Sequence, residues 1–405
     1  MTTAVVTGAG VVAPNGLGTE AFWSATLRGD HVIKPIDRYD TTHFTSRLAG
    51  EVRDFDAARH LPSRLIPQTD RMTQFALAAA DWALADAALD TGDLARTELG
   101  VVTAGAAGGF DFGQRELQNL WGEGPDHVSA YMSFAWFYAV NTGQISIKND
   151  LRGPTGVLVA EQAGGIDAIA HARRALRGGA AVVLSGGMDS SLCPYGMAAR
   201  MAGGRLSTRD DPDRAFLPFD PDTDGHVPGE GGAILVLEEE GRALRRGATI
   251  HGEIAGHGAT FDPQPGSGRP RNLGRAIELA LADAGLAPDD IGVVFADADG
   301  SPESDHAEAE ALVRLFGPHG VPVTAPKTMI GRLCSGGAPL DVVLALRAVR
   351  EGLIPPTIKV TPGYALDLVR DRPRPFAGTA ALVLARGHNG FNSALVLRGR
   401  GKDHR

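Results

Sequence analysis

Short apolar segments that alternate with helical segments are the feature that most constrains the fold of this chain. Four of them, at residues 180–184, 233–237, 291–296 and 380–385, have the length and composition of buried strands. Between residues 71 and 89, apolar side chains instead recur at the spacing of an amphipathic helix. Buried strands that alternate with helices predict an α/β fold with largely parallel sheets.

The N-terminal segment resembles the start of a nucleotide-binding unit but lacks its other requirements. Residues 4–10 form an apolar strand that runs into Gly8 and Gly10. A dinucleotide fingerprint needs a third glycine and then a helix. Pro14 opposes a helix start at that place. We therefore expect a strand here and no bound nucleotide.

Two predicted helices that each begin at a pair of glycines share the same spacing of an aspartate, an arginine and a glycine. In each segment, counted from an aspartate, an arginine lies six residues later and a glycine eleven residues later. The first set is Asp167, Arg173 and Gly178, and the second is Asp341, Arg347 and Gly352. One interpretation is a duplicated α/β unit whose two helices face each other at the centre. The alternative is that alanine-rich helices resemble one another by chance.

Composition narrows the classes of function. The formal net charge of −9 disfavours nucleic acid as a partner. No apolar run reaches the roughly 18 residues of a membrane span, and only two cysteines occur. His251 and His257 have no cysteine nearby that would suggest a metal site. We expect a cytoplasmic protein without metal, nucleic acid or membrane partners.

Three motifs closely resemble signatures of the β-ketoacyl synthase family. They are FLPFD with DGHVPGEGGA at 216–233, PKTMIG at 326–331 and GHNGFNS at 387–393. They occur in the family's order, and the similarity extends from residue 4 to about residue 397. The resemblance implies a thiolase-like, five-layer α-β-α-β-α fold that dimerises across a sheet edge. We place its two similar halves at 1–245 and 246–405.

The same resemblance locates the catalytic positions, and reactive side chains are missing from them. An active member has a cysteine at a sharp strand-to-helix turn and two histidines. Here Gln162 stands in the cysteine's place, and Asp299 and Arg332 stand in those of the histidines. A carboxamide is not usefully acylated by a thioester, and an arginine stays protonated. Lys327 is retained, and we expect it and Arg332 to form structural ion pairs, Lys327 with a carboxylate such as Glu230.

Gln162 within the sequence EQAGG at 161–165 resembles the chain-length factor, or ketosynthase beta subunit, of type II aromatic polyketide synthases. The resemblance implies a heterodimer with a catalytic ketosynthase alpha subunit, and acyltransferase activity only in that heterodimer. It also implies no bound cofactor, because malonyl units arrive on the phosphopantetheine of an acyl carrier protein.

Aromatic residues concentrate between residues 110 and 138, which hold eight of the chain's 24. Phe110, Gly113 and Leu117 are spaced to share one face of a helix. By resemblance, these three and Phe134 line the tunnel that a growing chain enters at the subunit boundary. Ordinary core or dimer packing is the alternative.

Three other functions remain open at this stage. Gln162 could promote malonyl decarboxylation by donating a hydrogen bond to an enolate oxygen. A nucleophile could lie elsewhere, at Cys334 or Cys193. The chain could also be a purely structural partner without influence on the product.

Overall fold

The computed structural model of the chain describes residues 2–264 and 266–399. Its helices are α1 (Thr19–Arg28), α2 (Ala57–His60), α3 (Arg71–Asp86), α4 (Phe110–Gly122), α5 (Met132–Ala135), α6 (Val140–Asn149), α7 (Glu161–Arg177), α8 (Pro194–Ala202), α9 (Glu240–Arg245), α10 (Leu273–Ala284), α11 (Pro302–Phe316) and α12 (Gly337–Glu351). Its strands are β1 (Ala4–Ala13), β2 (Gly16–Leu17), β3 (Lys34–Pro35), β4 (Leu48–Ala49), β5 (Leu99–Ala104), β6 (Thr155–Leu158), β7 (Val182–Asp189), β8 (Gly231–Glu239), β9 (Gly252–Phe261), β10 (Val293–Phe295), β11 (Pro322–Thr324), β12 (Leu353–Ile354), β13 (Asp367–Leu368), β14 (Arg374–Pro375), β15 (Ala380–Gly387) and β16 (Phe391–Arg398).

The main strands follow one hydrogen-bonded path, β13-β11-β10-β15-β16-β9-β1-β8-β7-β5-β6. A short antiparallel pairing of Val5 and Val6 with Glu253 and Gly252 joins two similar sheets into this path. In each sheet the strands nearest the junction are antiparallel and the outer ones parallel. The expectation of largely parallel sheets was therefore wrong, and the sheets are mixed.

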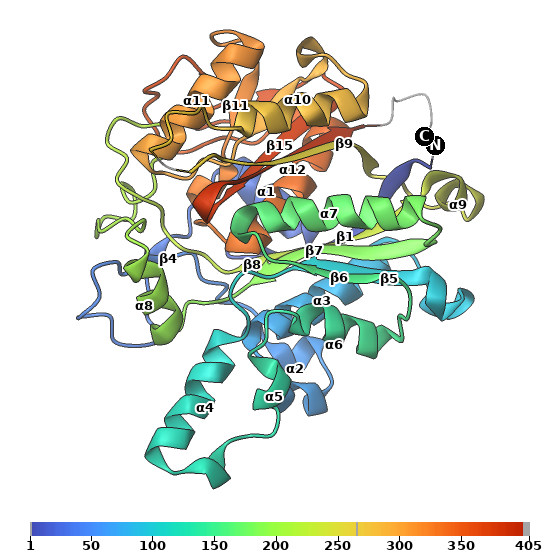
Figure 1. Cartoon of the computed structure of the whole chain (residues 1–405), viewed down its shortest axis with the longest axis vertical. Helices are drawn as coiled ribbons and strands as arrows, with labels where there is room; N and C mark the ends of the chain where they lie inside the picture. Colours follow the sequence, from blue (N-terminus) through green and yellow to red (C-terminus); the bar gives the residue numbers. More distant parts are fainter. Residues whose placement is uncertain (1, 265, 400–405) are drawn as a thin grey trace.

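Helices form three layers around the two sheets (Figure 1). α7 and α12 lie between the sheets, where they contact strands of both. α3 and α6 cover the outer face of the N-terminal sheet, and α10 covers that of the C-terminal sheet, with α11 beside it. The predicted five-layer α-β-α-β-α arrangement is confirmed. Among the described residues, no helix has both the length and the apolar character that crossing a membrane requires.

The two halves repeat one packing solution. Gly10 in β1 and Gly258 in β9 each face a helix, and an added Cβ would collide with the carbonyl oxygen of Ala79 in α3 or of Ala276 in α10. The missing side chains let α3 and α10 approach their strands equally closely. This match favours a duplicated unit over a chance resemblance. Residues 1–245 and 246–405 stay our proposed halves, with residues 1 and 400–405 outside the described part.

The repeated arginines tie each central helix to the opposite half. Arg173 of α7 forms an ion pair with Asp283, in α10. Arg347 of α12 donates to Glu20 of α1, with an Nη2–Oε2 distance of 3.0 Å. The shared spacing thus corresponds to a shared function of the two arginines in anchoring the central layer.

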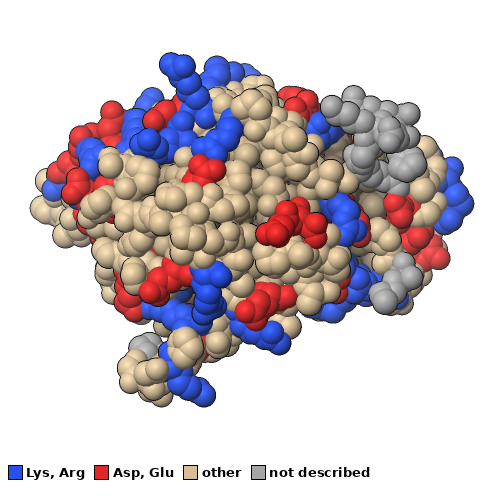
Figure 2. All heavy atoms as spheres, turned by 90° about the horizontal axis from the view of Figure 1, so that it is seen from above, with Lys and Arg blue, Asp and Glu red and all other residues tan. Residues whose placement is uncertain are grey.

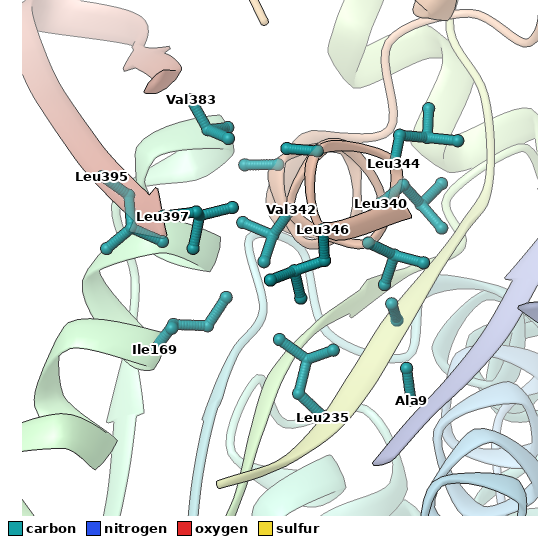
Figure 3. Close-up of a cluster of buried hydrophobic side chains, with 14 of the residues drawn as sticks. Ala9, Ile169, Leu235, Leu340, Val342, Leu344, Leu346, Val383, Leu395 and Leu397 are labelled. Atoms are coloured by element: carbon teal, nitrogen blue, oxygen red, sulfur yellow. The ribbon is translucent and has the colours of Figure 1, made fainter. Parts of the chain in front are cut away.

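The core is densest around α12, which is apolar on nearly all sides. Figure 3 shows its side chains between those of α7, β8, β15 and β16, with Leu340, Val342, Leu344, Leu346, Ile169, Leu235, Val383, Leu395 and Leu397 labelled. A helix that is hydrophobic all round belongs in an interior. On the face seen in Figure 2, by contrast, acidic and basic side chains are interspersed.

The two central helices meet at glycines. A Cβ on Gly165 of α7 would lie 2.5 Å from the carbonyl oxygen of Ser335, and it would also collide with the ring of Pro339. Such contacts force atoms to move, because protein interiors are close-packed. The junction of α7 and α12 therefore requires a residue without a side chain at position 165.

We predict opposite effects of Gly→Ala substitutions at two helical positions. Gly165→Ala should lower the free energy of unfolding by about 1–3 kcal/mol, because overpacking shifts the central helices. Gly143→Ala in α6, where a Cβ would meet no atom within 4 Å, should raise it by about 0.5–1 kcal/mol. Urea unfolding of the purified chain measures both. Equal effects of the two substitutions would contradict the close approach at Gly165.

Candidate functional site

The strand-to-helix turn expected at position 162 is present. β6 ends at Leu158, and α7 begins at Glu161, whose φ of 50° lies in the left-handed region. A residue other than glycine is strained there, and such strain often marks functional turns. The carboxylate of Glu161 holds the turn by pairing with Arg205 at 3.2 Å and by accepting from the backbone N–H of His388. The geometry of a nucleophile turn persists without a nucleophile.

Gln162 itself is sealed within the protein. Its side chain is fully buried, and neither its Oε1 nor its Nε2 has a hydrogen-bond partner among the described residues. A Cβ on Gly337 would lie 2.7 Å from its Nε2, so the carboxamide packs directly against the start of α12. An unpaired buried amide lowers stability, which makes this a costly place for a glutamine.

Arg332 fills the position predicted for one of the histidines, and carboxylates surround it. Its Nη2 lies 3.1 Å from the carboxylate of Asp297, and its Nε lies 3.4 Å from that of Asp299. Nη2 also donates to the backbone carbonyl of Arg386 at 2.7 Å. Burial alone would lower the pKa of Arg332, but the carboxylates of Asp297 and Asp299 raise it above its ordinary value. Arg332 is thus a fixed structural cation, and the second ion pair expected there exists.

Asp299, in the place predicted for the other histidine, is a fixed anion. It is buried, and the Oγ of Ser301 donates to it at 2.7 Å. Burial would raise its pKa, but the positive charges of Arg332 and Arg205 hold that pKa well below its usual range. An aspartate that stays ionised cannot donate a proton at neutral pH.

His226 belongs to the site, although sequence reasoning gave it no role. Its Nδ1 lies 4.0 Å from Oδ1 of Asp299, and the ring is buried. Burial lowers the pKa of His226 to about 3, so its ring is neutral at physiological pH. The signal available in the sequence was its place inside the glycine-rich signature at 224–233.

Lys327 forms a buried ion pair, but not with the carboxylate that we named. Its Nζ lies 2.8 Å from Asp341 at the start of α12 and donates to the carbonyl of Asp297 at 3.0 Å. Glu230 instead pairs with Arg71 at 3.2 Å and with Arg38. The difference arises because Lys327 follows β11 in the C-terminal half, whereas Glu230 precedes β8 and faces the start of α3.

A cavity of about 700 Å³ opens beside these groups. Charged residues from both halves contribute to its lining, among them Arg205, Asp297, Asp299, Arg332, Arg386 and His388. Gln162 is not one of its lining residues. The cavity therefore exposes ion pairs to a bound group, whereas Gln162 does not line it.

Neither cysteine is placed for chemistry. Cys193 and Cys334 are both buried, and burial raises the pKa of each thiol to about 11. Thiols with such pKa values are almost entirely protonated at neutral pH and are poor nucleophiles. Among the described residues, no group of three or more His, Cys, Asp or Glu side chains is arranged to hold a metal ion.

The predicted tunnel residues divide between two helices. Phe110, Gly113 and Leu117 lie on α4, where the ring of Phe110 packs 5.1 Å from that of Tyr195. A Cβ on Gly113 would reach Cβ of Trp136 at 3.5 Å, an ordinary contact that leaves little spare room.

Phe134 lies on α5 and lines a different hollow, of about 690 Å³, together with Phe137 and Ile147. Leu117 lines a hollow of about 550 Å³ with Trp121 and Tyr195. Within this chain, then, Phe134 is not brought into the hollow that Leu117 lines.

Comparisons with known proteins agree with this geometry. The family described as beta-ketoacyl synthase, N-terminal domain, matches residues 1–243, and its C-terminal domain matches residues 251–361. The actinorhodin polyketide putative beta-ketoacyl synthase 2 of Streptomyces coelicolor is 59% identical, over 97% of this chain and 98% of its own length. The tetracenomycin polyketide synthase ketoacyl synthase beta subunit of Streptomyces glaucescens is 58% identical, over 98% of each chain.

Solved structures show the same fold. The ishigamide ketosynthase/chain length factor matches with a TM-score of 0.89 at 29% identity, over 99% of this chain and 100% of that one. A structure described as a type II PKS acyl-carrier protein in complex with its ketosynthase bound to the hexaketide matches with a TM-score of 0.88 at 26% identity, over 98% of this chain and 100% of that one.

This chain belongs to the β-ketoacyl synthase family. Within the family it is of the ketosynthase beta subunit type, the chain-length factor of type II aromatic polyketide synthases. The resemblance to the chain-length factor is thereby confirmed, and so is the thiolase-like fold. The assignment of Gln162 to the nucleophile position stays a prediction.

Arg332→Met should destabilise the chain severely. Removing the cation leaves Asp297 and Asp299 buried without compensation, which costs about 3–5 kcal/mol of unfolding free energy. Arg59→Met is the matched control, since Arg59 pairs with Asp56 on the surface and exposed pairs contribute little. Urea unfolding of both variants measures the contrast. A variant at position 332 as stable as the control would show that the buried ion pairs are not coupled as described.

Proposed function

We propose that this chain is the non-acylated chain-length-factor subunit of a type II polyketide synthase. It pairs with a catalytic ketosynthase, and together they build and size a poly-β-ketone chain from malonyl-acyl carrier protein. The observation on which this rests is Gln162, a carboxamide at the nucleophile turn that is fully buried and lies outside the cavity. The acyl chain must then be held by a thiolate of the partner subunit.

The charges around the turn support the same division of labour. Arg332 is a fixed cation, and Asp299 is a fixed anion beside a neutral His226. Proton transfer needs a group whose pKa lies near the working pH. Each of these three groups is instead held in one charge state, and Lys327 is tied to Asp341 in a buried ion pair, which fits a structural network and not an acid–base pair.

A large exposed aromatic surface supports pairing with another protein. Trp121 is 83% exposed, Ile147 74% and Trp136 49%, and all three lie on or beside α4, α5 and α6. β6, at one end of the strand path, presents an unpaired edge next to Val159, which is 49% exposed. Contiguous apolar surface and a free strand edge favour a protein interface. A catalytic ketosynthase of the same fold, docked across this edge, is the partner that we propose.

The face of α4 supplies a steric means of setting length. Position 113 carries no side chain, whereas Phe110, one turn earlier, carries an aromatic ring that packs on Tyr195. Bulk on such a wall limits how far an extending chain can reach. We propose that Phe110, Gly113, Leu117 and Phe134 border the tunnel once the partner completes it, because in the isolated chain Leu117 and Phe134 border separate hollows.

The substrate follows from the same proposal. In this proposal the chain itself binds no cofactor, and the growing acyl group arrives on the phosphopantetheine of an acyl carrier protein. The related ketosynthase structure in complex with a type II acyl-carrier protein supports this choice of carrier.

Two experiments test the division of labour directly. Co-expression with a catalytic ketosynthase, followed by affinity capture of one subunit, should recover both in equal amounts. Mass spectrometry of the captured pair after exposure to an acyl thioester should find the acyl group on the ketosynthase and none on this chain. An acyl adduct on this chain, or condensation of malonyl thioesters by this chain alone, would overturn the proposal.

The decarboxylase alternative is testable through Gln162. The unpaired Nε2 could donate to an enolate oxygen, but the side chain does not line the cavity. We therefore expect equal carbon dioxide release from malonyl-carrier protein by the wild-type pair and by the pair with Gln162→Ala. A large loss of release in that variant would favour the alternative.

The other alternative, a purely structural partner, is tested by exchanging this chain for a relative. A purely structural partner would leave the product length unchanged.

We predict that side-chain volume on α4 sets product length. Gly113→Trp should shorten the polyketide, because the indole adds bulk at a position of the wall that has no side chain, and Phe110→Ala should lengthen it. Chromatography and mass spectrometry of products from the heterodimer measure both. The matched control is Arg275→Trp on α10, where the side chain is exposed and borders none of these hollows. Unchanged lengths in both test variants, with pairing intact, would refute the tunnel assignment.

A further inference from the structure

The start of α4 depends on a carboxylate supplied by another helix. The first N–H groups of a helix have no partners within it, and the residue before α4, Gly109, has no side chain to accept from them. Oδ2 of Asp70 accepts from the N–H of Phe112, in the first turn of α4, at 2.8 Å. Negative charge at a helix N-terminus is also favoured by the helix dipole. Asp70 therefore caps a helix that lies 40 residues further along the chain.

The same carboxylate also begins α3. Asp70 is the N-cap of α3, and its Oδ1 accepts from the N–H of Met72 at 2.8 Å. Its side chain is buried. α3 packs on β1 and β8 within the body, whereas α4 projects away from it (Figure 1). One buried side chain thus joins the projecting helix to the sheet layer.

The backbone around this point is closely fitted. A Cβ on Gly109 would lie 2.8 Å from Cβ of Asp70, so the segment before α4 lies directly against it. A second buried carboxylate, Asp189, accepts from the N–H groups of Ala106 and Ala107 at 3.1 and 3.3 Å. The two carboxylates fix both ends of the turn that leads into α4.

We propose that Asp70 is a positioning residue for product length, because the N–H that it holds lies between Phe110 and Gly113. This inference rests on the proposed function of α4. Releasing that N–H lets the first turn of α4 move relative to the sheets, and both tunnel residues move with it. Leaving that buried N–H without its acceptor shifts such an equilibrium by about 10- to 100-fold.

The test substitution is Asp70→Asn, which keeps the shape of the side chain. Its single carbonyl oxygen can accept from Met72 or from Phe112 but not from both, since the amide nitrogen is a donor. Asp56→Asn is the matched control, because Asp56 caps α2 in the same way, through the N–H of Ala58 at 3.0 Å, and has no bond to α4. Each variant is co-expressed with the catalytic ketosynthase, supplied with malonyl-carrier protein and analysed for product lengths.

We expect Asp70→Asn to raise the fraction of off-length product by about tenfold or more, with the control unchanged. Asp70→Ser should do the same, because a serine still caps α3 but has one acceptor oxygen. The wild-type length in either paired variant, or an equal shift in the control, would overturn the proposal. If both Asp70 variants failed to pair with the catalytic ketosynthase, the proposal would also be overturned, since Asp70 would then act on assembly of the heterodimer.

The same assay separates this inference from the proposed function. Gly113→Trp, run alongside, tests whether α4 borders the tunnel at all. A change of length with Gly113→Trp but not with the Asp70 variants defeats only the inference about Asp70. No change with Gly113→Trp defeats the tunnel assignment first.

Discussion

The close contact between α7 and α12 is the constraint on which the rest of this structure depends. Two sheets can share one central layer only if its helices pack without a gap, and here Gly165 and Gly337 provide the fit. The side chain at position 162 is thereby directed into the junction of the two halves. A chain that has exchanged a nucleophile for Gln162 must still keep these glycines, because they hold the whole molecule together. Loss of chemistry and retention of the fold are therefore compatible.

The buried charged side chains around that junction stabilise one another. Arg332 is compensated by Asp297 and Asp299, and Lys327 by Asp341. Buried ion pairs add little net stability, but removing one partner is strongly destabilising. The buried charges beside the cavity are therefore held as a set, and none of them can be exchanged alone without a loss of stability.

Sequence patterns predicted the elements well and their partners less well. The apolar segment at 233–237 lies inside β8, and the helical spacing from residue 71 matches α3, because burial imposes those periods locally. Strand direction was mispredicted, since an apolar run has the same composition in either direction. The partner of Lys327 could not be read either, because Asp341 and Glu230 are both acidic and only the three-dimensional path decides between them. The assignment of Gln162, Asp299 and Arg332 to the catalytic positions stays a prediction, which rests on the glycine-rich motifs near them in the sequence.

The two halves differ at the element to which we assign a function. Between β10 and β11 the C-terminal half has the single helix α11, whereas between β5 and β6 the N-terminal half has α4, α5 and α6. A duplicated fold can tolerate such an insertion because connecting segments run over the surface of the molecule. The insertion is anchored by carboxylates of the scaffold, Asp70 and Asp189, which satisfy its backbone N–H groups. Sizing a product needs a wall that is held rigidly but is free to vary in bulk. A projecting helix capped from the core meets both requirements, and it does so without using the position where the family's chemistry resides.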